Sequence, residues 1–250
     1  MSEPLQGIFD DVIEFPDLQA KRRFDQLVGL DEIKTRLLKE GSLLLNPALL
    51  DQWSKKHYQR PIPLVQVFRD RPPLFLFGGD VGTGKTTLAK NFGDPIAREH
   101  SIGVKLYSLS LNARGTGAVG EMTRLISSAF DEVRSVAKRS RVVGSGVRAS
   151  VILLIDEADA LAQSREFAQM HHEDRAGVNA LIRGIDSLST DALPVLVVMC
   201  TNRLDAIDPA IQRRAAAIFD FHRPNEIQRR TVLRAALEGT GFSDGDIAAR

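Results

Sequence analysis

The chain has 250 residues and a nearly balanced charge, with 33 Lys and Arg against 32 Asp and Glu. This length allows one α/β domain with a core and a small appendage, and the charge balance excludes a global attraction to nucleic acid or anionic membranes. A single cysteine, Cys200, excludes an internal disulfide and suits a reducing compartment. No apolar run approaches the roughly 20 residues of a membrane-spanning helix, and no signal peptide opens the chain. We therefore expect a cytoplasmic protein that does not bind membranes.

The chain divides into three predicted parts. Residues 1–23 are expected to form an acidic arm that is at most partly ordered and ends in Lys21-Arg22-Arg23. Residues 24–223 are expected to form the large domain. After Pro224 the pattern becomes helical over Glu226–Leu237. Residues 224–250 are therefore predicted to be the start of a small helical lid that is incomplete.

Five apolar runs, separated by helix-like segments, predict the strands of the large domain. They are Leu74–Phe77, Lys105–Leu111, Val151–Ile155, Val195–Cys200 and Ala217–Phe221. The third and fourth runs are almost continuously apolar, as in parallel strands that helices cover on both faces. Strands that alternate with helices predict an α/β fold with a doubly wound, five-stranded parallel sheet.

Residues Gly79–Thr86 fit the phosphate-loop pattern G-x-x-x-x-G-K-[ST], between a predicted strand and a predicted helix. Glycines let the backbone N–H groups point at a polyphosphate, and the helix N-terminus adds further donors. Lys85 is expected to reach the β- and γ-phosphates, and the Thr86 hydroxyl to bind Mg²⁺. The strand–loop–helix context disfavours a chance match. The residues expected to bind the nucleotide here are Gly79, Val81, Gly82, Thr83, Gly84, Lys85, Thr86 and Thr87.

Two carboxylates follow the third apolar run directly. Asp156 is expected to hold Mg²⁺, and Glu157 to act as the general base toward the attacking water. The alternative interpretation is an ordinary buried strand that leads into an acidic helix start. The phosphate loop earlier in the chain favours the functional interpretation, because phosphoryl transfer needs both parts.

Three more polar residues are candidates for the same site. Asn202 follows the fourth run, where its amide would sense the γ-phosphate or the attacking water; an Asn in an ordinary turn is the alternative. Arg213 and Arg214 precede the fifth run, and one of them, with Arg214 ranked first, is expected to act as an arginine finger on a neighbouring subunit. The alternative for the arginines is a solvated basic helix end.

In this order the motifs resemble those of AAA+ ATPases, over approximately residues 24–238. The resemblance implies that Val28 and Gly29 flank the adenine of ATP, and that the five strands lie in the order 5-1-4-3-2. It also implies a homo-oligomer, specifically a hexameric ring with ATP and Mg²⁺ at the subunit interfaces.

Within the family, the chain is most similar to remodellers of HORMA-domain proteins. Leu109–Asn112, Val178–Asp186 and Arg213–Ala215 carry this similarity. It implies a ring that partly unfolds a HORMA protein, in bacterial members as part of antiphage signalling. One departure is the segment 113–120, which lacks the aromatic residue that threading rings present after their second strand.

Two other functions remain open. A nucleic-acid-directed switch or loader is indicated by Lys138, Arg139, Arg141 and Arg148, although a solvated basic loop is the favoured interpretation of that cluster. An ATP-binding module with low turnover is the second alternative. Glu157 disfavours it, because such modules often lack this acid.

Overall fold

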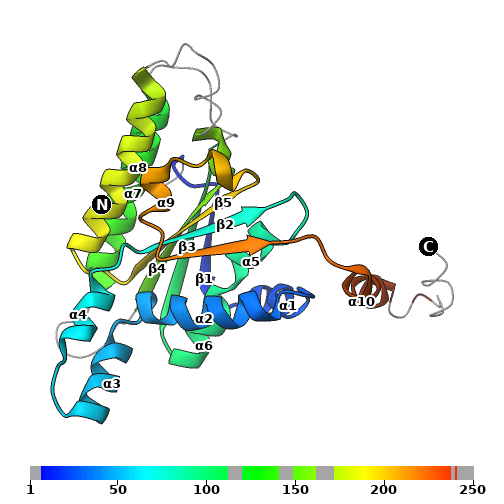
Figure 1. The fold of residues 1–250 in the computed structure, drawn as a ribbon, viewed down its shortest axis with the longest axis horizontal. Coiled ribbons are helices and arrows are strands. Elements are labelled where there is room, and N and C mark those ends of the chain that lie inside the picture. The colour runs from blue at the N-terminus through cyan, green and yellow to red at the C-terminus, as the bar shows by residue number, and fades with distance from the viewer. Residues whose placement is uncertain (1–6, 112–119, 141–148, 162–171, 238–239, 241–250) are drawn as a thin grey trace.

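The computed structural model describes residues 7–111, 120–140, 149–161, 172–237 and 240 (Figure 1). Its strands are β1 (Asp11–Phe15), β2 (Leu74–Gly79), β3 (Gly103–Ser110), β4 (Ala149–Asp156), β5 (Val195–Thr201) and β6 (Ala217–Phe221). Its α-helices are α1 (Leu18–Asp25), α2 (Asp31–Leu45), α3 (Ala48–Tyr58), α4 (Pro63–Arg69), α5 (Lys85–Asn91), α6 (Gly93–His100), α7 (Glu121–Ser140), α8 (His172–Thr190), α9 (Pro209–Gln212) and α10 (Glu226–Leu237). Two short 3₁₀ helices, Ala158–Leu161 and Leu204–Ala206, follow β4 and β5.

The strands form one sheet in the order β1-β3-β4-β5-β2-β6. All neighbours pair in parallel except β1, which is antiparallel to β3. The five strands predicted from the sequence therefore lie in the expected order, 5-1-4-3-2. The predicted number of five strands was wrong, because β1 adds a sixth strand beside β3.

The extra strand comes from the segment that the sequence analysis treated as a partly ordered arm. Phe9 packs on Tyr107 with ring centroids 4.9 Å apart. The ring of Phe15 packs closely on Gly93, because a Cβ on Gly93 would lie 2.5 Å from that ring. The buried Asp94 carboxylate accepts a hydrogen bond from Asp17 N at 2.7 Å, at the start of α1. The acidic residues of this segment fit an edge strand, because one of its faces meets solvent. The predicted boundary at residue 24 falls inside α1.

Two apolar layers cover the sheet. In β2, Leu74 and Leu76 pack toward α7 and α8, whereas Phe75 and Phe77 pack toward α2, α5 and α6. Figure 1 shows these two groups of helices on either side of the sheet. This burial on both faces explains the continuous apolar runs of β4 and β5, and it leaves the carboxyl ends of the parallel strands as the place for polar chemistry.

The final described helix, α10, extends away from the sheet (Figure 1). It spans the predicted residues, and none of them is buried. That it begins a lid domain stays a prediction. Among the described helices, none is both long and apolar enough to cross a membrane.

Candidate active site

The phosphate loop connects the end of β2 to the start of α5. Gly79 has a φ of +142°, and a Cβ on it would lie 2.1 Å from the carbonyl oxygen of Phe221 in β6. Gly84, with a φ of +92°, stands directly before α5. Only glycine meets both demands, a left-handed backbone and close contact with a neighbouring backbone.

Lys85 is held inside this loop. Its Nζ donates hydrogen bonds to the carbonyl oxygens of Gly79 and Asp80, both at 2.7 Å, and the residue is 6% exposed. Burial lowers the pKa of the Lys85 ammonium, while Cys200, Asp156 and Asp80 act in the opposite direction. The Lys85 ammonium can exchange its bonds to these carbonyl oxygens for bonds to phosphate oxygens, because anionic oxygens are stronger acceptors.

Thr86, in the first turn of α5, meets Asp156 at the carboxyl end of β4. Thr86 Oγ1 donates to Asp156 Oδ1 at 3.3 Å, and the backbone N–H of Glu157 donates to the same oxygen at 2.9 Å. A hydroxyl and a carboxylate form a hard oxygen donor set, which is the kind that Mg²⁺ takes in nucleotide sites. The predicted metal-binding pair is thus brought together.

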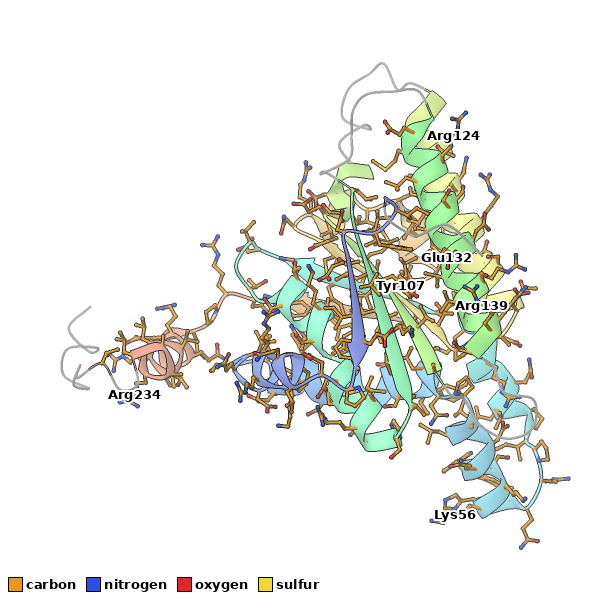
Figure 2. All side chains as sticks on the ribbon, turned by 180° about the vertical axis from the view of Figure 1, so that it is seen from behind. Lys56, Tyr107, Arg124, Glu132, Arg139 and Arg234 are labelled. Atoms are coloured by element: carbon orange, nitrogen blue, oxygen red, sulfur yellow. The ribbon has the colours of Figure 1, made fainter. Side chains whose placement is uncertain are left out.

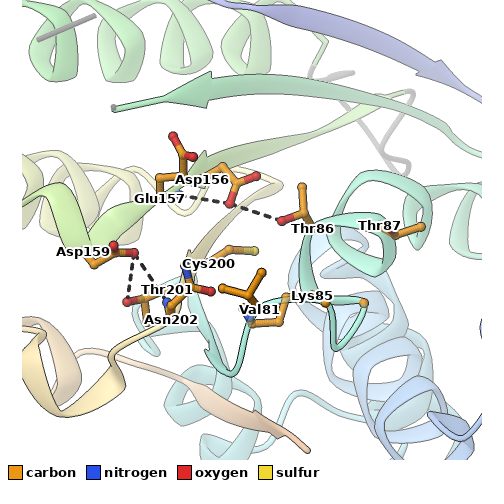
Figure 3. Close-up of a pocket in the computed structure, with 12 residues that line it drawn as sticks. Val81, Lys85, Thr86, Thr87, Asp156, Glu157, Asp159, Cys200, Thr201 and Asn202 are labelled. Atoms are coloured by element: carbon orange, nitrogen blue, oxygen red, sulfur yellow. Dashed lines mark hydrogen bonds between the residues drawn. The ribbon is translucent and has the colours of Figure 1, made fainter. Parts of the chain in front are cut away.

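Glu157 leaves the strand with a φ of +55°, a left-handed conformation that is rare for a residue with a side chain. Its Oε2 accepts a hydrogen bond from Ser110 Oγ at 2.6 Å. In Figure 3 the Glu157 carboxylate points away from Lys85 and Thr86. The predicted general base is therefore held at the end of β3.

Asn202 lies at the end of β5, as predicted, beside a carboxylate that the sequence analysis missed. Asp159 Oδ1 accepts from Thr201 Oγ1 and from the backbone N–H of Asn202, both at 3.4 Å (Figure 3). Asp159 lies three residues after Asp156, on the 3₁₀ helix that follows β4. The sequence Asp-Glu-Ala-Asp contained a signal for this residue. One helical turn after Asp156 brings the Asp159 side chain back toward the ends of the strands.

These groups line one pocket of about 240 Å³. The predicted residues that line it are Val81, Gly82, Gly84, Lys85, Thr86, Thr87, Asp156, Glu157 and Asn202, and the residues that prediction missed are Asp159, Cys200 and Thr201. Cys200 is buried in β5, and burial raises the pKa of its thiol. Gly79 and Thr83 belong to the loop but are not among the lining residues.

Val28 and Gly29 lie outside this pocket but next to the loop. A Cβ on Gly84 would lie 3.4 Å from both Leu27 and Leu30, the residues on either side of them. Gln228 of α10 covers Gly29, because a Cβ there would lie 2.5 Å from Gln228 Cδ. The segment is thus placed between the phosphate loop and α10.

The two predicted arginine fingers differ in their surroundings. Arg214 donates to both carboxylate oxygens of Asp186 in α8, at 2.8 and 3.0 Å, and to Ala210 O at 3.0 Å. Asp186 raises the pKa of the Arg214 guanidinium through this hydrogen bonding. Arg213 is exposed. Neither arginine lies in the pocket of its own chain.

The comparisons with known proteins identify the family. Residues 75–223 match the model of the ATPase family associated with various cellular activities (AAA). The chain belongs to the AAA family of ATPases. The matched range contains the phosphate loop, both acids, Asn202 and both arginines.

This AAA ATPase is similar to CD-NTase-associated protein 6 of Escherichia coli strain MS 115-1. The two are 52% identical over 239 residues, which are 96% of this chain and 77% of the relative. Among solved structures, it resembles one chain of the E. coli MS115-1 HORMA:CdnC:Trip13 complex, with a TM-score of 0.85, 51% identity, and coverage of 96% of this chain and 78% of that one. It also resembles Rhizobiales Trip13, with a TM-score of 0.70, 44% identity, and coverage of 96% and 79%.

Proposed function

We propose that this AAA ATPase uses ATP hydrolysis to remodel a HORMA-domain protein in bacterial antiphage signalling. The observation that carries the proposal is the likeness, at 51% identity, to a chain of a complex that contains a HORMA protein. The name of the similar E. coli protein also links it to a CD-NTase. We further propose that the protein works in the cytoplasm as a homo-oligomer, specifically a hexameric ring.

The residues of the pocket supply the parts that phosphoryl transfer needs. The loop N–H groups and Lys85 bind the triphosphate, and Thr86 with Asp156 holds Mg²⁺, which neutralises developing charge on the phosphate oxygens when bound. Glu157 accepts the proton of the attacking water once it leaves Ser110. Asn202 orients the water or the γ-phosphate, and Val28 with Gly29 flanks the adenine.

The arginine finger comes from a neighbouring subunit. Arg214 must break a bidentate ion pair with Asp186 to reach a neighbour, whereas the exposed Arg213 needs no such exchange. We therefore propose that both arginines serve the interface. Arg213 reaches toward the phosphate of the next subunit, and Arg214 holds the end of α9 against α8.

The nucleic-acid alternative is weakened by the pairing of its basic cluster. Lys138 lies 3.1 Å from Asp191, and Arg139 lies 3.3 Å from Glu132 (Figure 2). Arg141 and Arg148 lie outside the described residues, as does most of the predicted pore segment 113–120. The low-turnover alternative is weakened by Glu157, which is placed beside Asp156 in the pocket.

The first experiment measures ATP turnover by the purified chain alone, with double-stranded DNA, and with the HORMA-domain protein from the same genome. Stimulation by the HORMA protein, absent in a Glu157→Gln control, supports remodelling. Stimulation by DNA but not by the HORMA protein would overturn it in favour of the loader. ATP binding without turnover under all conditions would favour the binding module.

A further inference from the structure

We propose that the hairpin formed by α3 and α4 docks against the start of α2 in a second copy of the chain, head to tail. The inference rests on the proposed homo-oligomer and adds a contact to it outside the nucleotide site. Three observations carry it: an exposed aromatic surface, positive charges around it that have no ion pair among the described residues, and negative charges at the start of α2 that have none either.

The hairpin exposes large apolar side chains. Trp53 is 41% exposed, Tyr58 51%, Leu64 47% and Val67 62%. The ring of Trp53 packs against the rings of His57 and Tyr58, with centroids 5.5 Å apart in both pairs. Aromatic side chains exposed together on a projecting element are typical of protein interfaces, because a stable monomer gains nothing from them in water.

Positive charges surround this surface. Lys55, Lys56 and Arg60 are exposed and form no ion pair with another described residue, whereas the nearby Asp51 is already paired with Arg69. Figure 2 shows Lys56 at the outer end of the hairpin, far from Arg234 on α10. Such a surface is complementary to a partner surface that carries acidic side chains beside apolar or aliphatic area.

The chain offers such a surface itself. The exposed face of α2 carries Asp31, Glu32, Thr35, Arg36, Lys39 and Glu40. Glu40 is paired with Arg36 and Arg71, but Asp31 and Glu32 are exposed and form no ion pair within the described part of the chain. Lys39 is also exposed and forms no ion pair with a described residue, so the acidic part of this face is its first turn, at Asp31 and Glu32. The aliphatic stems of Arg36 and Lys39 supply apolar area beside that turn.

These two acids and the hairpin lie toward opposite ends of α2. Asp31 and Glu32 begin this helix, its 15 residues span about 22 Å, and α3 and α4 follow its last residue, Leu45. Figure 1 shows α3 and α4 on the side of α9, and α1 on the side of α5, which follows the phosphate loop. A contact between two different surfaces is head to tail, and it forms a ring when the rotation between successive copies closes. This contact therefore brings the α9 side, with its arginines, toward the phosphate-loop side of the next copy.

The test is a charge reversal and its rescue in the full chain, with sedimentation velocity in ATP and a Glu157→Gln background that retains ATP. Lys55→Glu with Lys56→Glu should raise the concentration for half-assembly about tenfold. Asp31→Lys with Glu32→Lys should do the same. All four changes in one chain should restore assembly. Trp53→Ser should weaken it independently of charge.

Matched reversals on α7 and α8, Arg124→Glu with Arg183→Glu, serve as the control and should leave assembly unchanged, because both arginines are exposed and neither forms an ion pair with another described residue. Unchanged assembly in both double variants, or no recovery in the combined one, would overturn the contact. A wild-type chain that stays monomeric in ATP would overturn the contact and the homo-oligomer together. ATP affinity, measured separately on each variant, keeps a failure of the phosphate loop distinct from either result.

Discussion

Ser110 Oγ donates a hydrogen bond to Glu157 Oε2 at 2.6 Å, from the end of β3 to the residue after β4. The strands place this pair together, because Ser110 stands opposite Asp156 in their parallel register. The general base of the proposed reaction is thereby restrained by a hydroxyl outside the phosphate loop. In the proposed mechanism, Glu157 exchanges this bond for one to the attacking water.

Replacing Ser110 should release the base. A hydrogen bond to a charged group contributes about 1.5–3 kcal/mol, so Ser110→Ala should raise basal ATP turnover, by about tenfold or more, at saturating ATP. Ser110→Thr keeps a hydroxyl and should behave like the wild type. Unchanged or slower turnover in Ser110→Ala would show that the bond does not limit hydrolysis.

Variants at Lys85 and Glu157 should affect different quantities, ATP affinity for Lys85 and turnover for Glu157. Lys85→Ala removes the cation from the loop and should weaken ATP affinity by about tenfold or more. Glu157→Gln should keep ATP affinity and reduce turnover by about 10²–10⁴-fold. Calorimetric titration and steady-state turnover distinguish the two. Normal ATP binding by Lys85→Ala would contradict the phosphate-loop assignment, and normal turnover by Glu157→Gln would remove Glu157 as the base.

The two arginines should differ in stability. Arg213→Ala should reduce turnover with little change in the free energy of unfolding, because Arg213 is exposed. Arg214→Ala leaves Asp186 without its bidentate partner and should destabilise the chain, by about 1 kcal/mol. Mixing each variant with wild-type subunits should give a non-additive loss of turnover, about 10³-fold at the limit, for the residue that acts on its neighbour. An additive mixing curve for both would exclude a finger here.

Gly79 and Gly82 form a matched pair for testing the loop backbone. Both have positive φ, but a Cβ on Gly79 would meet Phe221 O at 2.1 Å, whereas nothing lies within 4 Å of one on Gly82. Gly79→Ala should therefore cost about 2–4 kcal/mol of unfolding free energy, and Gly82→Ala about 1 kcal/mol. Urea unfolding without nucleotide measures both. Equal costs would contradict the packing of the loop on β6.

Asp191 should give a pH-dependent contribution to stability. Hydrogen bonds from Arg134 and Lys138 of α7 lower its pKa to about 2. Because the pKa is lower in the folded state, the stabilisation is complete above the unfolded value near 4 and is lost as the pH falls toward 2. Asp191→Asn should cost about 1–2 kcal/mol at pH 7 and progressively less below pH 4. Glu99→Gln on α6 is the control, and an equal cost at pH 7 and pH 3 would contradict the ion pair.

Much of the site could be predicted because its chemistry lies in contiguous residues. Gly79–Thr86, Asp156 and Glu157 each follow an apolar run, and parallel strands bring such ends to one edge of a sheet. Asp159 was missed although its spacing was visible, since a third carboxylate has no fixed place in the motif. Ser110 was missed because no local pattern marks a serine that meets an acid from another strand.

The sequence by itself determined the α/β class, the strand order implied by its family resemblance, and the residues of the phosphate loop, because these follow from local periodicity and short motifs. Only the tertiary structure decided that residues 11–15 join the sheet as an edge strand, that Ser110 holds Glu157, and that Arg214 is paired with Asp186. Each of these depends on contact between segments far apart in the chain. The local sequence does not distinguish among the possible partners, which packing and hydrogen-bond geometry determine.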